Sequence, residues 1–206
     1  MSLKYFVKVG NVNNLSDARY CSAMGVNQLG FKLNDFDNNS SIIDNIKEII
    51  GWINGVDTVG EFDNNNVEFI NSIIKIELFD FIQLNHKISI NDVNIDPKRI
   101  IISIKHIDEF NEFFVDDFIK KFSKISYLII ENVELFTSIQ LYKFSKNFKI
   151  LINPTLNFIK NENLINKYSF LGYNLFGSNE IKAGFPTISI FSLSHKPELY
   201  FCGIAG

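Results

Sequence analysis

Residues 5–33 read YFVKVGNVNNLSDARYCSAMGVNQLGFKL. Two short apolar runs, residues 5–9 and 28–33, enclose a longer segment, residues 15–24, that has the length and composition of a helix. Gly25 follows this segment, and a glycine can end a helix by adopting the left-handed conformation without a steric penalty. Strand, helix and strand in this order predict a βαβ unit with parallel strands.

The same alternation continues along the chain, except for a short and poorly patterned excursion that runs through Lys98. Near-continuous apolar strands fit a parallel sheet that is covered on both faces. Eight βα units favour an α/β fold of the (β/α)8 TIM barrel type, with an open doubly wound sheet as the alternative. No linker, low-complexity tail or charge block marks a second domain, so we expect residues 1–206 to form a single domain. Strands are expected at residues 5–9, 28–33, 58–62, 81–84, 100–104, 127–130, 149–152 and 171–175, and helices at 15–24, 42–53, 67–78, 110–122, 135–144, 162–168 and 188–193.

The composition is that of a globular protein, with 46% hydrophobic and 21% charged residues among 206. A formal net charge of −3 predicts no nucleic acid or anionic membrane as a partner. Every apolar run is far shorter than the roughly 18 residues of a spanning helix, and the N-terminus lacks a signal-peptide pattern. Cys21 and Cys202 have neither metal nor CxxC spacing, so we expect a reducing, cytoplasmic location, with Cys21 as a core thiol.

Several blocks of the chain resemble the phosphoribosylanthranilate isomerase family. Residues 7–12, VKVGNV, are similar to the family's VKICGI, and residues 25–31, GVNQLGF, to its GAD-LGF. VGEF at 59–62 is similar to VGVF, and FIQLN at 81–85 to VVQLH. LIIEN at 128–132 falls where the family has LLLDS, and residues 174–180 fall where it has DVSSGVE. The resemblance covers nearly the whole chain, and its first block is the most specific.

The resemblance implies an Amadori rearrangement in tryptophan biosynthesis, without a metal or an organic cofactor. A general acid opens the ribose ring, a general base removes the proton from the adjacent carbon, and the last two βα loops bind the phosphate. The partner would be a small phosphorylated metabolite. On the matching positions, Glu131 and Lys8 would be the catalytic residues, Asn11, Gln83, Asn85 and Asn174 would bind substrate, and Thr155, Gly177, Ser178 and Asn179 would bind phosphate.

Other positions depart from the family's pattern. Gly10 stands where the family has the cysteine that acts as the general base, and a glycine has no side chain to accept a proton. Pro154 precedes Thr155 where the family has a glycine pair, and proline removes an N–H donor. His86 is displaced by one residue from the family's histidine, so it is expected in a loop, while His106 and His195 have no metal or triad spacing.

Three hypotheses remain open at this stage. The chain is a divergent isomerase with Glu131 as its acid, or a non-catalytic paralogue that binds a phosphorylated metabolite or a protein. The third hypothesis is different phosphosugar chemistry that uses Lys8 and Glu131. Lys8 is expected either to point into the barrel mouth or to pair with a carboxylate such as Glu131. The oligomeric state is expected to be monomer or homodimer.

Overall fold

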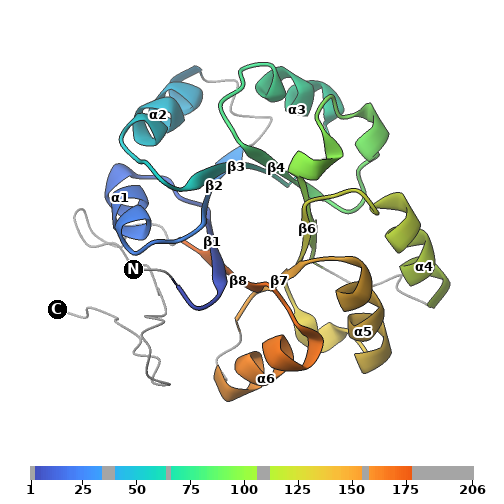
Figure 1. Cartoon of the computed structure of the whole chain (residues 1–206). Helices are drawn as coiled ribbons and strands as arrows, with labels where there is room; N and C mark the ends of the chain where they lie inside the picture. Colours follow the sequence, from blue (N-terminus) through green and yellow to red (C-terminus); the bar gives the residue numbers. More distant parts are fainter. Residues whose placement is uncertain (1–2, 34–39, 64–65, 106–111, 155–157, 178–206) are drawn as a thin grey trace.

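The computed structural model describes residues 3–33, 40–63, 66–105, 112–154 and 158–177. Eight parallel strands close into a barrel in chain order, with β8 paired to β1, and the helices surround it (Figure 1). The predicted α/β barrel is therefore confirmed. The strands are β1 Phe6–Gly10, β2 Gln28–Leu33, β3 Asp57–Phe62, β4 Phe81–Asn85, β5 Ile100–Ile104, β6 Tyr127–Ile130, β7 Ile150–Ile152 and β8 Gly172–Phe176. The helices are α1 Leu15–Ala23, α2 Ser40–Gly51, α3 Val67–Ile74, α4 Glu112–Lys121, α5 Ser138–Asn147 and α6 Phe158–Tyr168, with 3-10 turns at Ile90–Asp92, Pro97–Arg99 and Val133–Leu135.

Alternate residues of several strands belong to two separate cores, because successive side chains of a strand point to opposite faces. The larger core lies between the barrel and the helices and includes Val7 and Val9 of β1. A smaller core lies inside the barrel and closes it below the mouth. It consists of Val59, Ile101, Tyr127, Ile129 and Leu151, with Phe6, Phe81 and Leu171 packed against it.

Several helix boundaries differ from the sequence-based expectation. Helix α3 ends at Ile74, four residues early, and the chain adopts a positive φ of 54° at Glu77, which a helix cannot continue through. Helix α5 begins at Ser138 instead of Leu135, because Thr137 forms a capping box with Gln140. Gly25 has a φ of 76° after α1, as predicted.

Two further expectations concern the fourth and last helices. The poorly patterned excursion after β4 contains two 3-10 turns, at Ile90–Asp92 and Pro97–Arg99. The helix expected at residues 188–193 lies outside the described residues. No helix in the described part of the chain is long and apolar enough to cross a membrane.

Candidate functional site

A buried ion pair lies at the C-terminal end of the barrel, between β1 and β3. The Lys8 side chain is fully buried, and its Nζ donates hydrogen bonds to Oε1 of Glu61 and, at 3.2 Å, to Oδ1 of Asn174. Asn174 is the register partner of Lys8 on β8. The second carboxylate oxygen of Glu61 accepts the backbone N–H of Asn11 at 3.0 Å. Lys8 thus has a carboxylate and an amide oxygen that offset the loss of water around its charge.

Glycine on the intervening strand makes this pairing possible. Strand β2 separates β1 from β3, and at Gly30 a Cβ atom would lie 2.1 Å from Oε1 of Glu61 and 3.0 Å from Nζ of Lys8. Lys8 and Glu61 therefore occupy the space that a side chain at position 30 of β2 would need. The sequence-based expectation that Lys8 pairs with a carboxylate such as Glu131 was wrong in its partner, because Gly30 gives the nearer Glu61 access to Lys8.

The Glu61 carboxylate also fills the space next to Gly10. A Cβ at Gly10 would lie 2.5 Å from Oε1 of Glu61 and 3.1 Å from Nζ of Lys8. Contacts this short are not seen for real Cβ atoms, so a side chain at position 10 requires Glu61 to move. The carboxylate of Glu61 can take this position because residue 10 is a glycine.

A second carboxylate, that of Glu131, follows β6 at the same end of the barrel. Its Oε1 accepts a hydrogen bond of 2.5 Å from Oγ of Ser103 on β5. Glu131 is only partly buried, whereas Glu61 is buried. Sequence reasoning found Glu131 and missed Ser103, because a single serine in an apolar strand carries no distinguishing signal.

A cluster of surface charges adjoins these carboxylates. Asp63 accepts from Lys32 and Lys105, each at 2.6 Å. Partial burial disfavours the charged form of Asp63, but hydrogen bonds from Lys105 and Lys32 outweigh it and lower its pKa. Burial also opposes the charge of Lys105, yet the hydrogen bond to Asp63 and the nearby charge of Glu131 raise its pKa. The cluster was not predicted, because it joins the ends of β2, β3 and β5.

The loops after β1 and β8 are tied together beside the ion pair. Asn11 has a φ of 55°, and its Nδ2 donates to the carbonyl of Gly177 at 3.3 Å. The amide of Gly177 donates to the carbonyl of Gly10 at 2.8 Å. The predicted phosphate donor at Gly177 is therefore already engaged within the protein. Thr155, Ser178 and Asn179 lie outside the described residues.

The remaining predicted substrate residues have different surroundings. Oε1 of Gln83 is buried and has no hydrogen-bond partner in the described part of the structure. Oδ1 of Asn85 accepts the amide of Lys87 at 3.0 Å, so this side chain closes the turn after β4. Nδ2 of Asn174 donates to Oδ1 of Asn153 at 2.8 Å. Gln83 is thus the predicted residue with an acceptor still unused.

In the described part of the chain, the other candidate residues form no second centre. Cys21 is fully buried in α1, and burial raises the pKa of its thiol to about 12, as expected of a core cysteine. His86 lies in the turn after β4, while His106, His195 and Cys202 fall outside the described residues. Among the described residues, no group of three or more His, Cys, Asp or Glu side chains is arranged to hold a metal ion.

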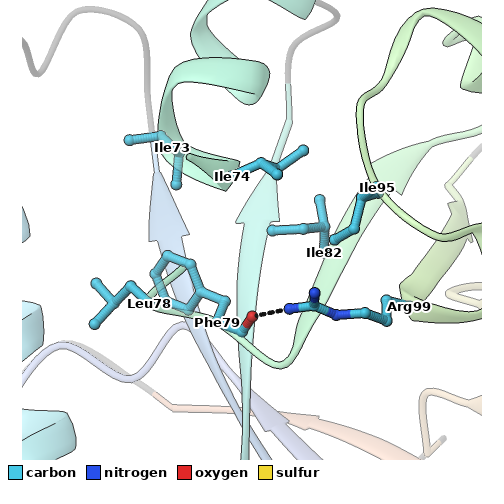
Figure 2. Close-up of a pocket in the computed structure, with 7 residues that line it drawn as sticks. All are labelled: Ile73, Ile74, Leu78, Phe79, Ile82, Ile95 and Arg99. Atoms are coloured by element: carbon cyan, nitrogen blue, oxygen red, sulfur yellow. Dashed lines mark hydrogen bonds between the residues drawn. The ribbon is translucent and has the colours of Figure 1, made fainter. Parts of the chain in front are cut away.

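A small cavity lies away from the barrel mouth. Figure 2 shows it beneath the C-terminal end of α3, where the guanidinium of Arg99 donates to the carbonyl of Phe79 at 2.6 Å. Its volume of about 10 Å³ leaves room for at most one water molecule, so it is too small for a metabolite. It is lined by Ile73, Ile74, Leu78, Phe79, Ile82, Ile95 and Arg99.

The fold and the charged mouth define the class of protein: a (β/α)8 barrel with ionisable side chains at the C-terminal ends of its strands. No model of a known protein family matches the sequence, and no curated protein matches it. Solved structures do match in fold. Phosphoribosyl anthranilate isomerase from Thermotoga maritima has a TM-score of 0.64 and 16% identity, over 84% of this chain and 87% of its own.

Two further solved structures are similar. One is a phosphoribosyl anthranilate isomerase in complex with reduced 1-(o-carboxyphenylamino)-1-deoxyribulose 5-phosphate, with a TM-score of 0.63, 16% identity, and coverage of 87% of this chain and 91% of its own. The other is KGPDC from Streptococcus mutans, with a TM-score of 0.56, 11% identity, and coverage of 85% and 88%. These likenesses establish the fold that the chain shares with such proteins.

Proposed function

We propose that this chain is an isomerase of the phosphoribosylanthranilate isomerase type, acting on a small phosphorylated sugar derivative. The observation that carries the proposal is the pair of carboxylates at the barrel mouth, Glu131 held by Ser103 and Glu61 held by Lys8. Ring opening and proton removal from the adjacent carbon need a proton donor and a proton acceptor, and the charges of Glu131 and Glu61 both act on Lys105 at this end of the barrel. N-(5'-phosphoribosyl)anthranilate is the first substrate to test.

The backbone at Asn11 supports the resemblance on which this proposal draws. Asn11 stands where the family motif has glycine, and its φ of 55° is in the left-handed region that glycine enters most readily. Asparagine is among the few other residues that tolerate this region. The solved neighbour in complex with a deoxyribulose 5-phosphate derivative further supports a phosphorylated ligand.

In this proposal Glu131 donates the proton that opens the ribose ring. Lys8 neutralises the negative charge of Glu61 at the mouth. Gln83 offers its unused Oε1 to a donor on the substrate. Asn11, Asn85 and Asn174 line the mouth and orient the substrate, with Asn174 acting through its contact with Lys8. The phosphate is assigned to the segments that contain Thr155, Gly177, Ser178 and Asn179.

A non-catalytic barrel that binds a phosphorylated metabolite is the second candidate. Two observations favour it: Gly10 has no side chain, and Pro154 lacks the amide that a glycine would supply. The engaged amide of Gly177 removes another phosphate donor. A barrel that catalyses a different reaction of a phosphosugar with Lys8 and Glu131 is the third candidate. It requires hydrogen bonding between these two side chains, whereas Nζ of Lys8 donates to Glu61 and Asn174.

Isomerase turnover tests the proposal. Loss of the fluorescence of phosphoribosylanthranilate, generated enzymatically in the assay, should follow addition of the protein. Glu131→Gln should lower kcat by about 10²–10⁴-fold, the range for loss of a positioned general acid. Glu162→Gln is the matched control. Glu162 lies on α6, pairs with Lys4 at 2.9 Å and has no contact with the mouth in the described structure.

Each result distinguishes the candidates. Turnover that depends on Glu131 supports the isomerase. Absence of turnover, together with a melting temperature that rises with ribose 5-phosphate, would contradict it and favour the binding protein, since a ligand that binds the native state stabilises it. Complementation of a tryptophan auxotroph that lacks this isomerase gives an independent readout in cells.

A further inference from the structure

We infer that Glu61 is the general base of the proposed isomerisation. This inference rests on the proposed function. Its starting point is the position of one atom: Oε1 of Glu61 lies 2.5 Å from the point where a side chain at position 10 would begin. The end of β1 therefore presents a carboxylate oxygen that comes from β3.

The surroundings of Glu61 fix this carboxylate in place. Lys8 and the amide of Asn11 each bind one of its oxygens, and the side chain is 9% exposed. A carboxylate oxygen has two lone-pair directions, so each oxygen retains an acceptor site after making one hydrogen bond. Glu61 is thus held rigidly by charge-assisted hydrogen bonds while it can still accept a proton.

The two glycines leave the space that the Glu61 carboxylate occupies. A Cβ at either Gly10 or Gly30 would lie within 2.5 Å of Oε1. Both positions belong to neighbouring strands whose ends form the mouth. Two carboxylates in different surroundings, Glu61 buried against a lysine and Glu131 partly exposed beside a serine, suit the opposite roles of base and acid.

The proton and electron transfers balance within this pair. Protonated Glu131 gives its proton to the ring oxygen as the bond to the anomeric carbon breaks, and the nitrogen lone pair forms the iminium bond. Glu61 then takes the proton from carbon 2. The electrons of that C–H bond form the double bond between carbons 1 and 2, and the iminium π electrons return to nitrogen. Glu61 returns a proton to carbon 1 while the hydroxyl on carbon 2 gives its proton to Glu131, which yields the ketone and restores both groups.

The competing interpretation is that Glu61 only neutralises Lys8. Glu61→Gln removes the base but also leaves Lys8 buried without a carboxylate, so this variant can lose activity by failing to fold. Glu61→Asp retains the charge and withdraws the carboxylate by one methylene. A direct base role predicts that Glu61→Asp folds normally and loses about 10²-fold in kcat, because a displacement on the order of 1 Å disrupts proton transfer.

An isotope effect separates the two interpretations. With substrate deuterated at carbon 2, the kinetic isotope effect on kcat should increase in Glu61→Asp, because proton abstraction becomes slower relative to the other steps. Glu162→Gln should match the wild type in both kcat and isotope effect. A folded Glu61→Asp variant with unchanged kcat and isotope effect overturns the assignment of the base.

A rescue variant provides the second test. Gly10→Cys, Glu61→Val and Asn174→Asp, made together, place a thiol at position 10 and keep a carboxylate beside Lys8. Turnover should exceed that of the Glu61→Val and Asn174→Asp double variant, in which position 10 is still glycine. Absence of turnover in the wild-type protein overturns both the function and this inference, whereas wild-type turnover that survives in folded Glu61→Gln overturns the inference alone.

Discussion

The absence of side chains at single positions shapes the barrel mouth. Gly10 and Gly30 lie beside a buried carboxylate that comes from a third position, Glu61. The sequence shows a charged residue inside an apolar strand at 57–62, which was a usable signal for Glu61 because such residues are rarely buried without a partner. Its partner was not predictable, because it depends on the space left by Gly30.

A substitution at Gly30 tests this steric argument. Gly30→Ala should destabilise the protein by about 1–3 kcal/mol, the usual result of overpacking a filled site. Gly51→Ala is the control, since no atom lies within 4 Å of the added Cβ there, and it should be neutral or stabilising by up to about 1 kcal/mol. Urea unfolding measures both. Equal effects at the two positions would show that Glu61 moves without penalty.

At the scale of elements, local caps set helix boundaries more sharply than hydrophobic periodicity does. The apolar spacing predicts a helix from Leu135, yet α5 begins after Thr137, whose hydroxyl accepts the amide of Gln140 at 3.3 Å. Oε1 of Gln140 accepts the amide of Thr137 at 2.9 Å in return. Such reciprocal bonds satisfy amides that the first helical turn leaves unpaired.

Removing the cap should weaken α5. Thr137→Ala should lower the free energy of unfolding by about 1 kcal/mol. Thr137→Ser keeps the hydroxyl and should lose much less. Chemical denaturation of the two variants gives the comparison, and a Thr137→Ser variant as unstable as Thr137→Ala would attribute the effect to the lost methyl group instead of the cap.

At the scale of the whole molecule, closure of the barrel assembles charges from several strands at one end. Asp63, which follows β3, binds Lys32 of β2 and Lys105 after β5, and the nearby charge of Glu131 acts on Lys105. None of these groups is near another in a short sequence window. Their pairing therefore depends on the closed parallel sheet.

This cluster predicts an acid-dependent loss of stability. The pKa of Asp63 is lower in the folded state than in the unfolded state. Its contribution to the free energy of unfolding is therefore fully present above the unfolded-state pKa of about 3.9, and it disappears as the pH falls through the folded-state pKa. Urea midpoints measured from about pH 6 down to about pH 3 should therefore fall less in Asp63→Asn than in the wild type. The effect should be modest because the side chain is 44% exposed. Asp44→Asn, at a 66% exposed side chain on α2, controls for removal of a surface charge, and an equal response would contradict the prediction.

The sequence by itself predicted eight strands in parallel βα units and favoured the barrel, because apolar runs and the helix period are local properties of the chain. It also located Lys8, Gln83 and Glu131, since each falls on or directly after a predicted strand. The tertiary structure decided for the closed barrel against an open sheet. It decided that Lys8 pairs with Glu61, which is 53 residues away. It also decided that Ser103 holds Glu131. The first pairing depends on the space that Gly10 and Gly30 leave between the strands, and the second on the side-by-side placement of β5 and β6, so both are set only when the barrel forms.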